Sequence, residues 1–428
     1  MSKDTRPGKR IVLHPFGSLG DVHPFIAIGI GLKERGHTPV IATHASMRGK
    51  IEAERIEFHA IRPDPLGTGE AAEIVRQAME SRRGPENVIR AMLSHLRESY
   101  DDLIEVLPGA DLVITHPIAF AGPIAAEKSG VRWASTALSP LSMFSQHDPP
   151  IIPGYRFLSL SYRRSRSVRR SLQWLTRAIA GPWFEPVYEL RAELGLPPDG
   201  IPILTGQRSP DLMLALFSEV LGAPQPDWPP NAHVTGFCFY DKHESGGLSP
   251  ELERFLHDGP APIIFTLGSA ACMSPGDFYR ESIQAARKLG RRAVLLTGMG
   301  TNEDIPDGMI ACGYAPYSAL FPRACAIVHH AGVGTTGQTL RAGRPMLVVP
   351  FSQDQPDNAA RATRLGAART IPRKRYTVDR AAAELRALLE DSVYARKAEE
   401  IGCRIRAEDG VAAACDAIEE LLGMRASR

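Results

Sequence analysis

The segment Gly17–Pro24 carries side chains that could transfer a proton. It reads Gly-Ser-Leu-Gly-Asp-Val-His-Pro and directly follows the apolar run Arg10–Leu13. Its glycines allow the backbone to turn tightly and to approach a ligand. Asp21 and His23 are the candidates for proton transfer, although Asp21 is equally well placed to cap a following helix. Both a catalytic and a capping role therefore remain open for Asp21.

The segment His329–Gln338 is suited to binding a pyrophosphate. It follows a β-like run and opens a helix, and a helix N-terminus offers unpaired N–H groups and a positive dipole end. His330 and two threonine hydroxyls add donors. Three glycines also fit the G-x-G-x-x-G pattern of dinucleotide-binding folds: Gly332, Gly334 and Gly337. That pattern usually follows the first strand of its domain. A nicotinamide- or flavin-dependent oxidoreductase is therefore the alternative interpretation.

A third segment, Phe351–Asn358, places the Asp354 carboxylate beside the Gln355 amide. This pair suits sugar hydroxyls, because a carboxylate accepts hydrogen bonds and an amide both donates and accepts them. Two weaker signals accompany it. Leu267–Ser269 is a glycine turn that ends a β-like run, and Tyr314, in a Gly-Tyr-Ala-Pro turn, could stack on a nucleobase.

These segments lie among short apolar runs that alternate with helical stretches. The β-like runs are Arg10–Leu13, Pro39–Thr43, Ile56–Ile61, Asp111–Thr115, Val131–Ala137, Leu212–Phe217, Pro262–Leu267, Arg292–Thr297, Ile310–Gly313, Ala326–His330 and Pro345–Val349. Helical patterns cover 24–35, 86–107, 119–130, 275–289, 334–342, 355–365 and most of 380–422. This alternation predicts parallel sheets covered on both faces. The motifs follow the strands, where ligands of such sheets bind.

The predicted architecture is α/β, with two Rossmann-like parallel-sheet domains facing each other across a cleft. Residues 1–221 form the first domain, the Pro- and Gly-rich stretch 222–250 is a linker, and residues 251–405 form the second domain. A final helical segment, 406–428, is expected to pack back toward the first domain.

Composition excludes several classes of protein. In 428 residues, 43% hydrophobic and 23% charged content is ordinary for a soluble globular protein. A formal net charge of +2 gives no reason to expect a nucleic-acid binder. The six cysteines show no CxxC spacing, so neither a zinc site nor a disulfide framework is indicated. No apolar run approaches the roughly 18 residues of a membrane span. We therefore expect a cytoplasmic protein.

The stretch between Pro149 and Phe184 is unusually basic. It contains no acidic residue, and seven arginines lie within 156–177, interleaved with aromatic residues that include Trp174. Three interpretations remain open: a solvated helix face, a peripheral contact with anionic lipid, or a cradle for an amphiphilic or carboxylated acceptor.

Taken together, the five motif segments resemble those of family 1 glycosyltransferases with the two-domain GT-B architecture. The bacterial macrolide, sterol and rhamnolipid glycosyltransferases are the most similar branch. The resemblance spans nearly the whole chain and is most specific over 314–358. His233–Phe237, preceded by Pro226–Pro229, is similar to the rhamnolipid-pathway enzyme, whereas 150–210 is the least matched part.

The resemblance implies a reaction. The second domain would bind a UDP- or dTDP-sugar, and the first a lipophilic small molecule with a hydroxyl group. A hexose would be transferred with inversion, without a metal or another cofactor, and no D-x-D motif of the metal–diphosphate type occurs in the chain. An inactive nucleotide-sugar-binding subunit is the alternative outside enzymes.

The resemblance also assigns residues. Asp21 stands at the position of the catalytic base, and His116 at that of its activating partner, so the two would share the acceptor proton; alternatively, His116 is only a strand-end histidine. Gln338 replaces the glutamate that holds the ribose hydroxyls in plant members, which leaves UDP and dTDP both open. The nucleotide-sugar contacts would be Ser18, Ser269, Tyr314, Ala315, His330, Gly332, Gly334, Thr335, Gln338, Asp354 and Gln355. The acceptor contacts would be Phe120, Phe144 and Trp174.

Overall fold

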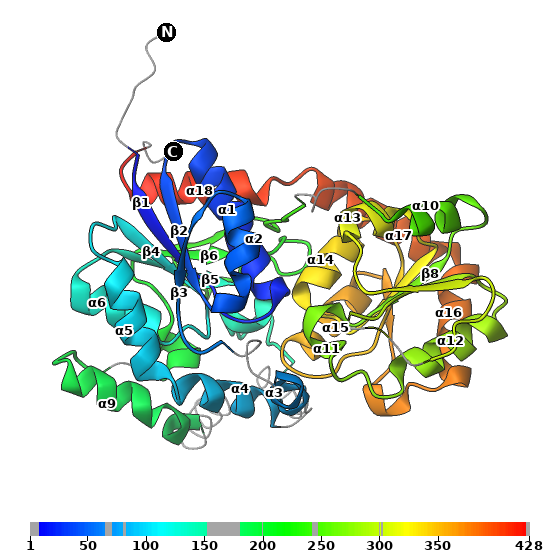
Figure 1. The fold of residues 1–428 in the computed structure, drawn as a ribbon, viewed down its shortest axis with the longest axis horizontal. Helices are drawn as coiled ribbons and strands as arrows, with labels where there is room; N and C mark the ends of the chain where they lie inside the picture. The colour runs from blue at the N-terminus through cyan, green and yellow to red at the C-terminus, as the bar shows by residue number, and fades with distance from the viewer. Residues whose placement is uncertain are drawn as a thin grey trace, which may run out of the picture.

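The computed structural model describes residues 8–64, 71–79, 83–151, 180–198, 200–241, 247–298, 300 and 303–424. Within these ranges the chain forms two parallel sheets, each in a lobe of its own (Figure 1). The first sheet has seven strands in the order β3-β2-β1-β4-β5-β6-β7. They are β1 (Arg10–His14), β2 (Thr38–Thr43), β3 (Glu57–Ala60), β4 (Leu112–Thr115), β5 (Trp133–Ala137), β6 (Leu212–Ala215) and β7 (Ala232–Val234).

Helices cover both faces of the first sheet, as the nearly continuous apolar strands require. They are α1 (Leu19–Glu34), α2 (Arg48–Ala53), α3 (Ala71–Ala78), α4 (Gly84–Leu93), α5 (Leu96–Val106), α6 (Ala121–Ser129) and α9 (Glu185–Glu193). Alternate strand residues serve opposite faces. Leu13 packs with the apolar side of α1, whereas Val12 packs with α5 and α6.

The second sheet has six strands in the order β10-β9-β8-β11-β12-β13. They are β8 (Ile263–Thr266), β9 (Ala293–Leu296), β10 (Met309–Cys312), β11 (Ala326–His329), β12 (Met346–Val348) and β13 (Ala368–Thr370). The helices that follow the first lobe are α10 (Pro250–His257), α11 (Gly268–Ala271), α12 (Phe278–Lys288), α13 (Tyr317–Leu320), α14 (Val333–Arg341), α15 (Gln355–Arg364), α16 (Val378–Glu390), α17 (Ser392–Arg406) and α18 (Gly410–Leu421). The predicted α/β class with two parallel sheets is confirmed.

Some expected elements differ in detail. The helical stretch 380–422 is three helices, because Asp391 and Asp409 each accept a hydrogen bond from a backbone N–H of the next helix and begin it anew. The stretch 86–107 is likewise divided into α4 and α5. Two short strands, β7 and β13, were missed. β7 lies inside the expected linker, and its three residues form no apolar run that would mark a strand.

The two lobes share apolar packing and a helical clamp. One buried cluster joins Met213 and Phe217 of the first lobe to Leu340 and Val348 of the second. Helix α18, red in Figure 1, lies on the first lobe against α1. There the Arg35 guanidinium contacts Asp416 at 2.6 Å and Glu419 at 2.9 Å. Among the described helices, none is both long and apolar enough to cross a bilayer.

Candidate active site

The candidate residues gather where the strand order of each sheet reverses. In the first sheet β1 and β4 are parallel neighbours, and in the second β8 and β11 are. Their connections leave toward opposite sides, which opens a crevice at the carboxyl ends of the strands. The loops after β1 and β4 carry Asp21 and His116. Those after β8 and β11 carry Ser269 and His330.

Asp21 is both a helix cap and an accessible carboxylate. It lies in the first turn of α1, where its Oδ2 accepts hydrogen bonds from the Ser18 amide at 2.8 Å and the Ser18 hydroxyl at 3.0 Å. Gly17 adopts φ +125°, and a Cβ there would lie 2.5 Å from Asp21 Oδ2. The side chain of Asp21 is still 35% exposed. Capping therefore orients the carboxylate without covering it, and the predicted nucleotide-sugar contact Ser18 is part of this cap.

His116 lies beside Asp21. Its Nε2 is 3.5 Å from Asp21 Oδ1, and its side chain is 5% exposed. Its Nδ1 accepts a hydrogen bond from the Ile118 amide at 3.3 Å. Because Nδ1 acts as the acceptor, the proton of the neutral ring is assigned to Nε2, which faces the carboxylate. The structure thus brings the two predicted residues together, with the N–H of His116 directed at Asp21.

The loop between β11 and α14 holds His330 against two glycines. A Cβ on Gly268 would lie 2.7 Å from its Cε1, and one on Gly332 would lie 2.4 Å from its Nε2. Burial lowers the pKa of His330 to about 4, so the ring is neutral. Its Nδ1 is buried and meets no hydrogen-bond partner in the described part of the chain. Gly332 provides no side-chain cap for α14, which leaves its first amides directed at this loop.

Thr335 and Gly334 lie in this first turn of α14, and Thr335 is 7% exposed. Gly334 faces the other lobe, since a Cβ there would lie 3.7 Å from the Cα of Gly20 in α1. The beginnings of α1 and α14 are therefore in contact. This contact builds one site from two lobes.

Asp354 and Gln355, predicted together as sugar contacts, have different surroundings. Asp354 is half-buried, and desolvation, with the negative charge of Asp21, raises its pKa to about 7. Its Oδ2 accepts a hydrogen bond from Asn358 Nδ2 at 2.7 Å. Gln355 is only 3% exposed, and its Oε1 accepts from the amides of Phe351 and Ser352. In this structure the Gln355 amide oxygen thus shapes the loop that presents Asp354.

The remaining predicted nucleotide-sugar contacts follow three different strands of the second sheet, β10, β8 and β11. Tyr314, after β10, is 56% exposed, and its neighbour Ala315 is buried. Ser269 is exposed in the first turn of α11. Gln338 donates from Nε2 to Asp241 at 3.4 Å, and its Oε1 is buried with no hydrogen-bond partner in the described ranges.

Of the three expected acceptor contacts, the structure describes Phe120 and Phe144. Phe120 is 3% exposed and packs edge-to-face on Phe184, so the structure places it in the core beneath the first sheet. An aromatic residue that precedes α6 is drawn into the sheet–helix interface, and the acceptor contact expected of Phe120 stays a prediction. Phe144 is half-buried with φ +45°. Trp174 and the arginines of 156–177 lie outside the described residues.

Sequence reasoning missed three residues that hold this site. His44 donates from Nε2 to the Gly17 carbonyl at 2.9 Å. Asp241 joins Gln338 to Arg341. Asn358, four residues after Asp354, bridges two loops. The i,i+4 spacing was the available signal for Asn358, since it places both residues on one face of a helix.

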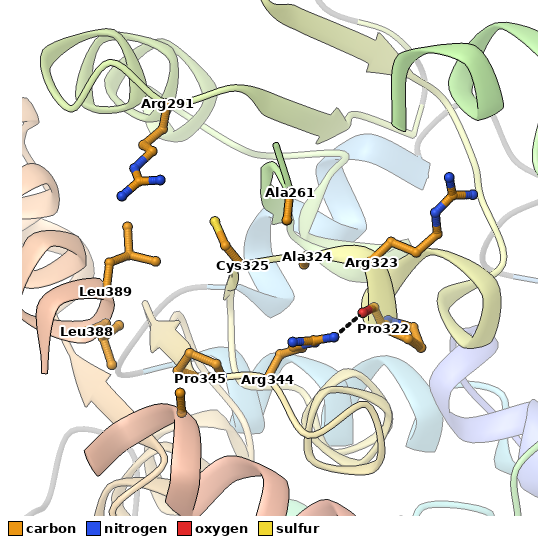
Figure 2. A pocket seen from close by; sticks show the side chains of 11 residues that line it. Ala261, Arg291, Pro322, Arg323, Ala324, Cys325, Arg344, Pro345, Leu388 and Leu389 are labelled. Carbon is orange, nitrogen blue, oxygen red and sulfur yellow. Dashed lines mark hydrogen bonds between the residues drawn. The ribbon is translucent and has the colours of Figure 1, made fainter. Parts of the chain in front are cut away.

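A cavity of about 550 Å³ lies elsewhere, and Figure 2 shows Arg291, Cys325 and Arg344 lining it. Ala261, Cys325 and Pro345 precede β8, β11 and β12, so this cavity is at the amino ends of the strands, at the opposite edge from the candidate site. Within the described ranges, no group of three or more His, Cys, Asp or Glu side chains is arranged to hold a metal ion.

Comparison with known proteins identifies the class. Residues 11–140 match the glycosyltransferase family 28 N-terminal domain, and residues 296–418 match the erythromycin biosynthesis protein CIII-like C-terminal domain. O-mycaminosyltylonolide 6-deoxyallosyltransferase of Streptomyces fradiae is 36% identical over 96% of this chain and 97% of its own length. The chain therefore belongs to the glycosyltransferase family of this relative and is itself a glycosyltransferase.

Other similar proteins are also glycosyltransferases. Sterol 3-beta-glucosyltransferase of Neurospora crassa is 30% identical over 96% of this chain, which spans only 27% of that longer protein. The solved glycotransferase of kitacinnamycin superposes with a TM-score of 0.70 at 20% identity, covering 97% of this chain and all of that one. Glycosyltransferase VinC in complex with dTDP gives 0.66 at 20% identity, covering 97% and 99%. The fold is GT-B, as expected, and the G-x-G-x-x-G pattern belongs to a glycosyltransferase rather than an oxidoreductase.

Proposed function

We propose that this enzyme transfers a hexose from a UDP- or dTDP-sugar to a hydroxyl of a lipophilic small molecule. The observation that carries the proposal is the meeting of an accessible carboxylate, Asp21, with the loops of the other lobe that present His330 and Asp354. The names of the relatives, which act on a macrolide or on sterols, support a lipophilic acceptor. Six free cysteines support a reducing, cytoplasmic setting.

The proposed chemistry is a single displacement at the anomeric carbon. The acceptor hydroxyl gives its proton to Asp21 while its oxygen bonds to that carbon, and the bond from the carbon to the diphosphate oxygen breaks. Attack from the side opposite to the leaving group inverts the configuration. In the assigned tautomer His116 already carries a proton on Nε2, so we infer that it orients the carboxylate rather than taking the proton.

The leaving diphosphate acquires negative charge. The first amides of α14 and the neutral His330 ring face the loop where we place it, and preorganised donors of this kind stabilise developing charge. We expect these groups to suffice without a metal ion. Product formed in the presence of a chelator, with inverted anomeric configuration by NMR, is the expected result. Retention of configuration, or activity restored only by a divalent cation, would contradict it.

We place the nucleoside beside Tyr314 and Gln338. Gln338 Nε2 donates to Asp241, and its buried Oε1 has no hydrogen-bond partner in the described ranges, so we propose that Oε1 accepts from one ribose hydroxyl when the nucleotide is bound. Ribose in UDP carries two hydroxyls and deoxyribose in dTDP only one. The VinC complex supports dTDP. Thermal unfolding with UDP, dTDP and NAD in parallel separates the choices: a shift with UDP or dTDP and none with NAD is expected.

Replacement of the base is the decisive test. Asp21→Asn should lower the transfer rate by about 10²–10⁴-fold, since general-base help of that size is lost, and should preserve UDP or dTDP affinity. Asp277→Asn, an exposed acid 68% accessible at the start of α12, is the matched control with unchanged activity. Full activity of Asp21→Asn, or loss of nucleotide binding together with transfer, would show that the assignment is wrong.

A further inference from the structure

We propose that Asn358 is a positioning residue that holds the sugar-binding carboxylate and the phosphate loop in one fixed arrangement. The amide nitrogen of Asn358 donates two hydrogen bonds, one to Asp354 Oδ2 at 2.7 Å and one to the Ala331 carbonyl at 3.0 Å. The residue is fully buried in the first turns of α15. The inference rests on the proposed function, because it assigns a ligand-binding purpose to the two loops that Asn358 joins.

The orientation of this amide follows from its neighbours. Asp354 Oδ2 and the Ala331 carbonyl are both acceptors, so the nitrogen of Asn358 must face them, and a flipped amide would oppose oxygen to oxygen. Its Oδ1 is buried and receives no hydrogen bond from any residue that the structure describes. Leaving a buried oxygen without a hydrogen bond costs free energy. The two hydrogen bonds made by the nitrogen of Asn358 offset that cost.

Ala331 shows what the second bond holds. Its φ of +66° is in the left-handed region, which a non-glycine residue occupies only when its surroundings enforce it. Two bonds do so here: the Ala331 amide donates to His329 Nδ1 at 3.1 Å, and its carbonyl accepts from Asn358. Ala331 lies between His330 and Gly332. Its conformation therefore sets the direction of the His330 ring and of the first amides of α14.

Asp354 shows what the first bond holds. The charged groups around its carboxylate are Asp21, from α1 in the other lobe, and Asp357 on its own helix, which is paired with Arg361 at 2.7 Å. Burial raises the pKa of Asp354 most, the Asn358 N–H lowers it, and both acids raise it further. Sugar hydroxyls donate to the carboxylate form. Sugar-nucleotide affinity should therefore rise as the pH passes upward through about 7, with a midpoint that the Asn358 hydrogen bond lowers.

The test measures binding of UDP-glucose and dTDP-glucose, and of UDP and dTDP alone, by calorimetry on both sides of neutral pH. Asn358→Ala should weaken sugar-nucleotide binding at neutral pH by about tenfold or more, the usual effect of losing a bond to a charged group. It should also move the midpoint to higher pH. Asn358→Asp, nearly equal in size, adds a like charge and should move the midpoint further. Asn358→Ser keeps a donor in a smaller side chain and should shift the midpoint less, which keeps the test valid where the alanine variant folds poorly.

Two controls separate positioning from simple stability. Asn231→Ala truncates an amide in the first lobe that donates to the Ser209 carbonyl at 3.0 Å, and it should leave the midpoint unchanged. In an Asp354→Asn background, Asn358→Ala should produce no shift. Folded Asn358 variants with wild-type affinity and midpoint would overturn the role of Asn358 alone. Failure of the wild-type enzyme to bind any of the four probes would overturn the proposed function and this inference together.

Discussion

Three ionisable side chains meet in the candidate site, and each is tuned by different neighbours. Asp21 is held by Ser18 and remains accessible. His116 accepts a hydrogen bond at Nδ1 from the Ile118 amide, and its Nε2 faces Asp21. Asp354 is partly desolvated near a second carboxylate, which favours its protonated form. One fold thus provides one accessible carboxylate, which we propose as the base, and one carboxyl that titrates near neutrality.

At this scale we predict a graded response at His116. His116→Ala should lower kcat by about 10- to 100-fold, because the oriented N–H beside Asp21 is lost, with little change in nucleotide Kd. His116→Gln can still donate toward Asp21 and should recover part of that loss. Steady-state kinetics with calorimetry on each variant gives the answer. Equal activity of the alanine variant and the wild type would remove His116 from the mechanism.

At the scale of elements, strand β1 ends in a buried histidine, His14. His14 is 2% exposed, and its Nδ1–H donates to the Ala42 carbonyl of β2 at 2.8 Å. Desolvation lowers its pKa to about 4, from 6.5 in the unfolded chain. The hydrogen bond therefore ties the two strands that begin the first sheet through a ring that must stay neutral.

Acidification should therefore destabilise this strand pair. Between about pH 6.5 and about pH 4 the unfolded chain binds a proton that folded His14 does not, so the unfolding free energy falls as the pH is lowered. The full effect is up to about 3 kcal/mol. His14→Asn keeps a donor for Ala42 and removes the titration. Urea unfolding at several pH values should show a shallower acid loss in this variant, and identical pH profiles would contradict the prediction.

At the scale of the whole molecule, an ion-pair network around the buried Arg361 joins the two lobes. Arg361 of α15 is 3% exposed and contacts both Asp148 and Asp357, while Asp357 also accepts from the Ile151 amide at 2.8 Å. Asp148 and Ile151 follow β5 of the first lobe. The network therefore anchors the segment 148–151 of the first lobe to α15, the helix that directly follows Asp354.

Breaking this network should cost far more than a surface pair. Arg361→Met leaves the buried Asp357 carboxylate without its cation and Asp148 with Arg364 alone, and it should lower the unfolding free energy by about 3–5 kcal/mol. It should also weaken donor binding, because α15 is displaced. Arg364→Met is the control: Arg364 contacts the same Asp148 at 3.0 Å but is 54% exposed, so a loss below about 1 kcal/mol is expected. Equal losses in the two variants would refute the distinction.

The sequence by itself determined the strands, the loops that follow them and the residue types in those loops. Apolar runs, glycine turns and helix starts are local signals, so β1, β8, β11 and the segments around Asp21, His330 and Asp354 were predictable. The parallel order of β1 and β4 then brings Asp21 to His116. The resemblance of those loops to known glycosyltransferases predicts that Asp21 and His116 form a pair.

Only the tertiary structure decided which neighbouring side chains turn inward. Phe120 is buried in the core, and the amide oxygen of Gln355 accepts hydrogen bonds from its own loop. Strand β7 forms only because β6 is there to pair with it. The bridge from Asn358 to Ala331 likewise crosses 27 positions of sequence. Such contacts depend on packing between elements distant in the chain. Local pattern carries no information about them, because the same residue types serve equally well in a core, a cap or a binding loop.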